Sequence, residues 1–274
     1  MKEIKNNADA ERFRDGAKKY ARYLETPQGR LRVDLAFANL CEFLPLGTPA
    51  MRALDLGCGP GVMAARLAQL GVHVTLLDSS ESMLSLAKTA AQSAEMTGRM
   101  TLKLGDALDV PSLFPAGSFD LVLCHNVLEY MEDPPAVLRS AARTLRNSSS
   151  VISILVRNQA GEVLKSAILD GDLAASTRNL NAEWAQESLY AGTVRLFTPK
   201  SLESMLARSS LKTIALRGVR TLSDYFPKTG LCDSQYEQIF ELERKLGARP
   251  DLAVVARYLH VLARPTDCGT SNQG

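Results

Sequence analysis

Residues 53–61 read ALDLGCGPG, and this stretch decides the fold of the 274-residue chain. It predicts a short apolar strand over 51–56, a loop with glycine at every second position, and a helix over 61–70. The first N–H groups of a helix have no partners within the helix, so a ligand can sit against them. Glycine lets the backbone approach such a ligand and take up positive φ. The stretch therefore predicts a ligand site where the strand passes into the helix.

Two interpretations of this glycine loop compete, and both require an acid after the next strand to hold a ribose. Residues 59–64 fit the dinucleotide pattern G-x-G-x-x-G/A. The spacing Asp55-x-Gly57-x-Gly59-x-Gly61 instead resembles the first motif of class I S-adenosylmethionine (SAM) methyltransferases. The next strand is expected over 73–77, and Asp78 ends it. A glycine turn that binds nothing is disfavoured because strand, turn, helix and acid are all in register.

Composition and charge are ordinary for a soluble globular protein. With 46% hydrophobic and 23% charged residues, the chain can form one α/β domain that carries an insertion. A formal net charge of +2 gives no strong attraction to polyanions. The N-terminal arm is nevertheless basic, with Arg12, Arg14, Lys18, Lys19, Arg22, Arg30 and Arg32.

The cysteines and the apolar runs exclude several protein classes. The five cysteines, at 41, 58, 124, 232 and 268, are widely spaced and include no C-x-x-C pair. Because no histidine cluster has metal-ligand spacing either, we expect neither a disulfide scaffold nor a metal site. The first residues do not read as a signal peptide, and no apolar run reaches membrane length. We therefore expect a cytoplasmic protein with no membrane partner.

Strands alternate with helices along the chain, which predicts a mostly parallel sheet with helices on both faces. Residues 1–45 are expected to form a helical arm broken at 26–29, residues 46–265 the main domain, and residues 266–274 a disordered tail. A helical insertion is expected at about 159–197. The seven expected strands are 51–56, 73–77, 100–104, 119–124, 150–156, 212–219 and 252–263. The expected helices are 10–23, 31–44, 61–70, 81–93, 134–146, 199–208 and 233–246.

Downstream residues favour SAM over a nicotinamide dinucleotide. Asp106 follows the strand 100–104, where methyltransferases place a carboxylate for the adenine amino group. Residues 125–130 (HNVLEY) follow the strand 119–124, the position of the wall near the sulfonium and the substrate. Asp78, Ser80 and Met83 fit a D-x-S-x-x-M pattern that is typical of methyltransferases, with Met83 against the adenine. No Tyr-x-x-x-Lys or other hydride-transfer signature is evident, so we expect SAM as the cofactor.

The chain as a whole resembles the bacterial tRNA 5-carboxymethoxyuridine methyltransferases from about residue 11 to 265. This resemblance implies a Rossmann-like class I methyltransferase fold, with a seven-stranded sheet. It also implies that the protein esterifies a carboxylate on a wobble-position uridine, with tRNA as the partner. The segments that carry it are Arg30-Leu31-Arg32, CHNVLEYMEDP at 124–134, Gly218-Val219-Arg220 with Asp224-Tyr225, Tyr236-Glu237 with Glu241-Leu242-Glu243, and Arg257-Tyr258-Leu259-His260-Val261.

The resemblance also implies a set of residues that bind the cofactor. Arg32 pairs with the SAM carboxylate, for which a planar guanidinium is well suited. Asp78 takes the ribose hydroxyls, and Asp106 or Ala107 lies at the adenine. The whole expected set is Arg32, Asp55, Gly57, Cys58, Gly59, Gly61, Asp78, Ser79, Met83, Asp106, Ala107 and His125.

Two residues are expected to act on the methyl acceptor. His125 lines the methyl-transfer cavity and is the candidate base if the acceptor is a neutral hydroxyl or amine. Arg157 ends the strand 150–156 on the ligand-facing edge and could hold an anionic acceptor, as could Arg195 or Arg220. A carboxylate acceptor needs no base because it is ionised at neutral pH.

Departures from the family keep a second class of acceptor open. Residues 147–150 (NSSS) replace the Pro-Gly-Gly that the family usually carries before its fifth strand. The insertion offers Arg195 and Lys200 but no lysine-rich run, although phosphate contacts supply most non-specific affinity for RNA. Trp184 and Tyr190 could stack on a base. The alternative is an O- or N-methyltransferase for a small-molecule metabolite, with the insertion as a lid.

Overall fold

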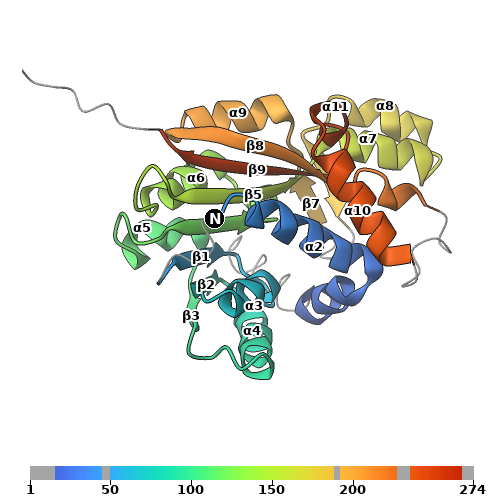
Figure 1. Ribbon diagram of the computed structural model, residues 1–274. Coiled ribbons are helices and arrows are strands. Elements are labelled where there is room, and N and C mark those ends of the chain that lie inside the picture. Colours follow the sequence, from blue (N-terminus) through green and yellow to red (C-terminus); the bar gives the residue numbers. More distant parts are fainter. Residues whose placement is uncertain (1–15, 45–49, 188–191, 227–234, 267–274) are drawn as a thin grey trace, which may run out of the picture.

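The computed structural model describes residues 16–44, 50–187, 192–226 and 235–266. Seven strands form one sheet in the order β3-β2-β1-β4-β5-β9-β8, and Figure 1 shows β3 and β8 at its two edges. The first five strands of that order are parallel, and β9 runs antiparallel to both β5 and β8. The strands are β1 (Arg52–Leu56), β2 (His73–Asp78), β3 (Met100–Leu104), β4 (Leu121–His125), β5 (Val151–Arg157), β8 (Leu211–Val219) and β9 (Tyr258–Pro265).

Helices cover both faces of the sheet, as the sequence predicts. One face packs against α5, α6 and α9, and the other against α2, α3 and α4. Such double cover explains why the central strands are mostly apolar rather than alternating between apolar and polar residues. The helices are α2 (Pro27–Cys41), α3 (Val62–Gln69), α4 (Glu81–Ser93), α5 (Val110–Leu113), α6 (Pro134–Arg143), α7 (Gln159–Ile168), α8 (Leu173–Asn179), α9 (Pro199–Ala207), α10 (Tyr236–Gly247) and α11 (Pro250–Ala253).

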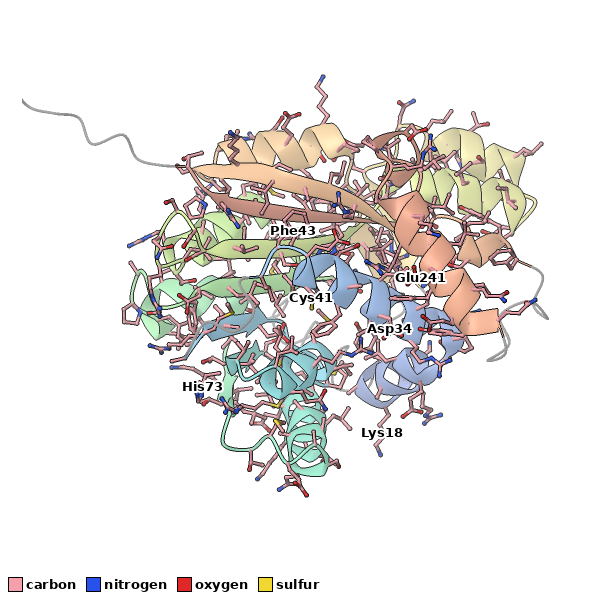
Figure 2. All side chains as sticks on the ribbon, viewed as in Figure 1. Lys18, Asp34, Cys41, Phe43, His73 and Glu241 are labelled. Atoms are coloured by element: carbon pink, nitrogen blue, oxygen red, sulfur yellow. The ribbon has the colours of Figure 1, made fainter. Side chains whose placement is uncertain are left out.

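The N-terminal part lies against the sheet through α2, preceded by helical residues 16–25. The predicted break lies at Thr26, after the helical residues 16–25, but α2 begins at Pro27 rather than at 31. Thr26 caps α2 by accepting from Gly29 N, and Pro27 occupies its first turn. Asp34, labelled in Figure 2, then joins three helices, since it accepts from Arg66 of α3 and from the hydroxyl of Tyr236 of α10. The arm is therefore packed onto the main sheet.

The insertion is only partly helical, which corrects the prediction. It begins with two short helices, α7 and α8, which lie together near α11 in Figure 1. It then forms an antiparallel hairpin of β6 (Trp184–Glu187) and β7 (Gly192–Arg195). Each of these strands has only four residues, so neither gives a periodic pattern long enough to predict a strand.

The C-terminal boundary is also different from the prediction. The expected strand 252–263 begins only at Tyr258, because Pro250 starts the short helix α11. The expected helix 233–246 is α10, with residues 233–234 outside the described residues. The expected disordered tail, apart from Thr266, also lies outside them, as do Arg12, Arg14 and Tyr190.

Candidate active site

A pocket opens at the carboxyl ends of the parallel strands, where ligands bind in sheets of this kind. It is lined by residues that the sequence singles out: Arg32, Asp55, Gly57, Cys58, Gly59, Asp78, Ser79, Met83, Asp106, Ala107, His125 and Arg157. Gly61 is an exception, because it does not line the pocket. A Cβ at Gly61, whose φ is +76°, would lie 3.0 Å from Ala87 Cβ, so this glycine is needed for packing against α4.

The glycine loop shapes the pocket, but its N–H groups donate hydrogen bonds within the protein. Gly57 N and Cys58 N donate to Leu77 O at 2.8 and 3.1 Å, and Gly61 N donates to Cys58 O at 3.0 Å. The positive φ of Gly57 and Gly59 makes these turns possible. These three N–H groups are thus satisfied within the protein and are not free for a ligand. The glycines instead bring the backbone close to the pocket.

Asp78 ends β2 and is held in a fixed orientation. Its Oδ2 accepts from Gly59 N at 2.8 Å, and its Oδ1 accepts from Ser80 N at 2.9 Å. Burial raises the pKa of Asp78, and the bonds from backbone N–H groups oppose that rise. The neighbouring Asp55 is 4% exposed, and burial, followed by the Asp78 charge, raises its pKa to about 7. The carboxyl groups of Asp55 and Asp78 therefore lie close together on one side of the pocket.

Asp106 has a local structural task as well as its place in the pocket. Its side chain accepts from Leu108 N at 2.8 Å, and Asp109 accepts in return from Asp106 N. These two bonds form a capping box at the start of a 3-10 turn. Ala107 follows in that turn and is buried at the pocket wall.

Arg32 is a buried cation facing the pocket. It is 5% exposed, and its Nη2 donates to the Tyr20 hydroxyl at 2.8 Å. Its guanidinium also lies 5.1 to 5.5 Å from the ring centres of Tyr20, Tyr23 and Tyr258. Within the described part of the chain no carboxylate lies within 4 Å of it. A buried cation that has tyrosine side chains around it and no carboxylate partner among the described residues is suited to an anionic ligand group.

Two acids that are not among the predicted site residues also line the pocket. Glu129 follows β4 and accepts from Asn126 Nδ2 at 2.9 Å and from Arg157 N at 3.0 Å, both at Oε1. Its Oε2 is buried and makes no hydrogen bond to the described residues. Glu187 comes from the β6–β7 hairpin, which no sequence pattern marked. Their presence makes the acceptor side of the pocket more acidic than expected.

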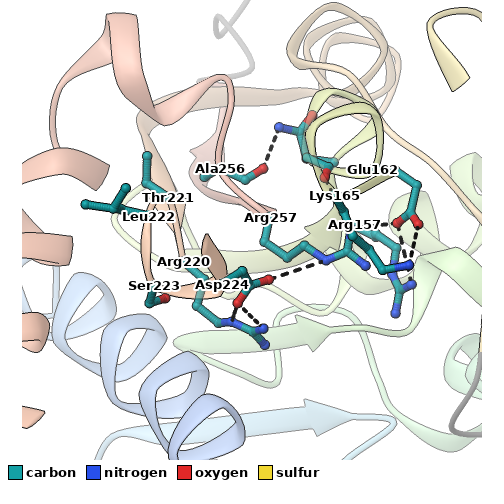
Figure 3. Close-up of polar contacts among 12 residues, drawn as sticks. Arg157, Glu162, Lys165, Arg220, Thr221, Leu222, Ser223, Asp224, Ala256 and Arg257 are labelled. Carbon is teal, nitrogen blue, oxygen red and sulfur yellow. Dashed lines mark hydrogen bonds and ion pairs between the residues drawn. The ribbon is translucent and has the colours of Figure 1, made fainter. Parts of the chain in front are cut away.

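Arg157 lies between two carboxylates without being hydrogen-bonded to either. Its guanidinium nitrogens are 3.9 Å from Glu162 Oε2 and 3.9 Å from Glu187 Oε1. These separations give attraction but leave the donors of the guanidinium directed elsewhere. Figure 3 shows how the network continues: Glu162 also pairs with Arg257 at 2.7 Å, and Arg257 is 3.8 Å from Asp224.

Arg220 and Arg195, the other candidates for holding an acceptor, do not line the pocket. Arg220 is 7% exposed and bonded to Asp224 in Figure 3, so it belongs to the buried network. Arg195 lies with its guanidinium 4.5 Å from the ring centre of Trp184 on the hairpin. Of the three arginines, only Arg157 reaches the pocket.

His125, at the end of β4, is partly buried in the pocket wall. Its Nε2 is 2.8 Å from Ser153 Oγ. Burial, with a smaller contribution from the Arg32 charge, lowers the pKa of His125 to about 3. The ring is therefore neutral at physiological pH and has little affinity for a proton, so it is a poor general base.

Neither a metal site nor a membrane-spanning helix is found in the described part of the chain. Among its residues no group of three histidines, cysteines or acids could hold a metal ion. None of the helices in that part of the chain is long and apolar enough to span a bilayer. Cys58 and Cys124 are buried, and burial raises the pKa of both thiols, which makes them inert packing residues rather than nucleophiles.

Comparison with known proteins identifies the class of this fold and pocket. A family described as "Methyltransferase domain" matches residues 48–213, more than half of the chain. The chain belongs to this methyltransferase family. The family and the fold imply SAM as the cofactor, and the protein is a SAM-dependent methyltransferase.

Three relatives illustrate how broad that family is. The tRNA 5-carboxymethoxyuridine methyltransferase of Escherichia coli K12 is 28% identical over 260 residues, covering 92% of this methyltransferase and 95% of the relative. The ubiquinone biosynthesis O-methyltransferase of Xanthomonas campestris pv. campestris B100 is 32% identical over 117 residues, 42% of this chain and 48% of that protein. A SAM-dependent methyltransferase structure from Mesorhizobium loti has a TM-score of 0.56 at 20% identity, covering 84% of this chain and 97% of its own.

Proposed function

We propose that this methyltransferase esterifies a carboxylate, that of 5-carboxymethoxyuridine in tRNA. The observation that carries the proposal is the match to the E. coli relative over 92% of this chain and 95% of that protein. Because the match covers 92% of this chain, it includes part of the N-terminal arm and part of the insertion, which the shared methyltransferase fold alone does not require. The match to the O-methyltransferase covers less than half of either chain.

The pocket supports a definite arrangement for the cofactor. Arg32, a buried cation with no carboxylate partner among the described residues, would hold the SAM carboxylate. Asp78 keeps lone pairs beyond its two backbone bonds and would accept from the ribose hydroxyls. Ala107 and Met83 are apolar pocket residues suited to the adenine ring. When bound, SAM supplies an electrophilic methyl group on its sulfonium.

Arg157 is the residue proposed to hold the acceptor. Its guanidinium faces the pocket, and both neighbouring acids are 3.9 Å away, outside hydrogen-bond distance. A planar guanidinium can donate two parallel hydrogen bonds to a carboxylate, which fixes the direction of the attacking oxygen. Positioning of this kind lowers the barrier without any proton transfer.

The weakness of His125 as a base favours an acceptor that is already ionised. A carboxylic acid has a pKa of about 4, so at neutral pH the acceptor is a ready nucleophile. A neutral hydroxyl or amine would need a base of higher pKa than His125, whose pKa is about 3. In this proposal His125 contacts the reactants and takes no proton.

A small-molecule acceptor is the second candidate, favoured by the acidic hairpin. Glu187 and Val194, one from each strand of β6–β7, line the pocket and place the insertion against it. A carboxylate at this position repels the phosphates of an RNA backbone. In that case the hairpin acts as a lid over a metabolite.

A transfer assay separates the two candidates. Purified protein is incubated with SAM carrying a tritiated methyl group and with tRNA that contains 5-carboxymethoxyuridine. Matched tRNA without that carboxylate is the control, and a metabolite extract is assayed in parallel. Label in the carboxylate-bearing tRNA alone supports the proposal. Label in the metabolite extract with none in either tRNA contradicts it and favours the second candidate.

A further inference from the structure

A chain of buried hydrogen bonds runs from the pocket wall through the sheet to α2. It begins at His125 of β4, whose Nε2 is 2.8 Å from Ser153 Oγ of β5. Ser153 Oγ is 2.7 Å from His260 Nε2 of β9. His260 Nδ1 is 3.4 Å from Asn39 Nδ2 of α2. Ser153 and His260 are fully buried, so neither Ser153 Oγ nor the ring nitrogens of His260 have water as an alternative partner.

Asn39 sets the direction of donation along this series of hydrogen bonds. An amide nitrogen can only donate, so His260 Nδ1 accepts and the proton of that ring is on Nε2. That proton is donated to Ser153 Oγ. A hydroxyl oxygen can accept two bonds, but the buried Ser153 proton has no other acceptor among the described residues, so the hydroxyl donates it to His125 Nε2. His125 Nε2 is thus an acceptor, and the proton of the neutral His125 ring must be on Nδ1.

The surroundings hold both rings neutral and in place. Burial lowers the pKa of His260 well below its usual range, and the neighbouring His125 and Arg217 act in the same direction. The two rings pack edge to face at 86°, with their centres 5.3 Å apart. Asn39 itself is 4% exposed. With one proton on each ring and one on the hydroxyl, each of the hydrogen bonds that join these four residues has one donor and one acceptor.

We propose that Asn39, His260 and Ser153 are positioning residues that fix His125 as a neutral Nδ1–H donor toward an anionic oxygen in the pocket. His125 lines the pocket, and its Nδ1 makes no hydrogen bond with any residue in the described part of the chain. The tautomer follows from the hydrogen bonds alone. The identity of the oxygen, that of the acceptor carboxylate, rests on the proposed function.

This arrangement gives His125 a role in selecting the acceptor. A carboxylate offers only acceptor atoms, so it can take hydrogen bonds from His125 Nδ1–H and from the Arg157 guanidinium. An amine acceptor would place its own N–H groups against these donors and leave them without partners. The pocket therefore discriminates in favour of an oxygen anion by the direction of its hydrogen bonds.

The tautomer can be measured directly by NMR. The protein has three histidines, so long-range 1H–15N correlation of the 15N-labelled protein gives three imidazole patterns. The variant H73Q removes the pattern of the exposed His73 at the start of β2, labelled in Figure 2, and the variant S153A perturbs the two that remain. The inference predicts the Nδ1–H pattern for His125 and the Nε2–H pattern for His260. An Nε2–H pattern for His125 in the wild-type protein overturns the inference.

The variants S153A and S153T test the link to the acceptor. The variant S153A removes the hydroxyl that donates to His125, so His125 shifts toward Nε2–H and the KM for the carboxylate acceptor rises about tenfold. The Kd for SAM stays unchanged, and the variant S153T, which keeps the hydroxyl, retains the wild-type His125 pattern. An unchanged tautomer in the folded S153A protein contradicts the inference. If His125 has the Nδ1–H pattern but no tRNA is methylated, the proposed function fails and the inference stands.

Discussion

Arg220 Nη1 donates to the hydroxyl of Tyr23 at 2.7 Å, across 197 residues of sequence. The bond joins the N-terminal helical segment to the end of β8. Arg220 also bonds to Asp224, and its backbone has a positive φ of 60°, a conformation that a non-glycine residue keeps only when its surroundings hold it there. This hydrogen bond therefore holds the N-terminal helical segment against the end of the edge strand β8.

The variant R220M is expected to destabilise the protein. Among the described residues, it leaves Asp224, which is 7% exposed at its side chain, with only the more distant Arg257 as an ion-pair partner, at 3.8 Å. Removing one partner of a buried pair leaves the other charge poorly compensated, so we expect a loss of about 3 kcal/mol in the free energy of unfolding. Chemical denaturation measures it. The variant R249M, which removes an exposed arginine paired with Asp251, is the control and should unfold as the wild type does.

Tyr258 is expected to ionise near neutral pH. Burial raises the pKa of Tyr258, but the charges of Arg32, Arg157, Arg220 and Arg257 together outweigh burial and lower it to about 7. The tyrosinate absorbance of the wild-type protein should rise through pH 7, and the variant Y258F should lack this step. The variant Y225F should keep the step, because burial first, and then the Asp224 charge, raise the pKa of Tyr225 to about 12.

The same residue gives a pH dependence of stability with a definite sign. The pKa of Tyr258 is about 7 in the folded protein, against 10.0 for an unperturbed tyrosine, so folding favours the ionised form. The unfolded chain then holds more protons between pH 7 and pH 10, and the free energy of unfolding of the wild type should rise with pH over that window relative to the variant Y258F. A difference that stays constant across the window would show that Tyr258 remains a phenol.

Asp55 should act in the opposite direction. Burial, and then the Asp78 charge, raise its pKa from 3.8 to about 7. Between these values the folded protein keeps a proton that the unfolded chain releases, so stability falls as pH rises from about 4 to about 7. The variant D55N removes this dependence. Wild type and D55N should therefore diverge by up to about 1.4 kcal/mol per pH unit in that window, measured by denaturation at a series of pH values.

The variant D78A is expected to weaken SAM binding about 13- to 160-fold for each ribose hydrogen bond that is lost. It removes the carboxylate proposed to hold the ribose, and charged hydrogen bonds of this kind contribute about 1.5 to 3 kcal/mol each. Isothermal titration calorimetry measures the Kd. The variant D170N, which changes a half-exposed acid paired with Lys165, is the control and should bind SAM normally. A folded D78A protein with the wild-type Kd would contradict the proposed place of the ribose.

The sequence could predict the central half of the molecule because its signals there are local. The strand, glycine loop and acid at Asp78 lie within about 30 residues, and their register alone places them at one edge of a parallel sheet. Gly61 shows the limit of such reasoning, since a glycine in the motif turned out to serve packing against α4. A sequence pattern does not show whether a glycine is needed for the approach of a ligand or for packing against a neighbouring helix.

The acceptor side could not be predicted because distant segments build it. Glu187 reaches the pocket on a hairpin with strands of four residues, too short to show a period. Tyr20 enters from the arm, and the partners of His125 come from β5, β9 and α2. Single sequences carry no signal for pairings such as that of Ser153 with His260, which are 107 residues apart.

The chemical nature of the transferred methyl group tests the central claim most directly. After transfer of a tritiated methyl group to tRNA, the product is treated with mild alkali, which hydrolyses methyl esters and leaves methyl ethers and methylated amines intact. The account predicts that the label is released as methanol. Label that stays on the tRNA through this treatment would show that the acceptor is not a carboxylate and would contradict the account.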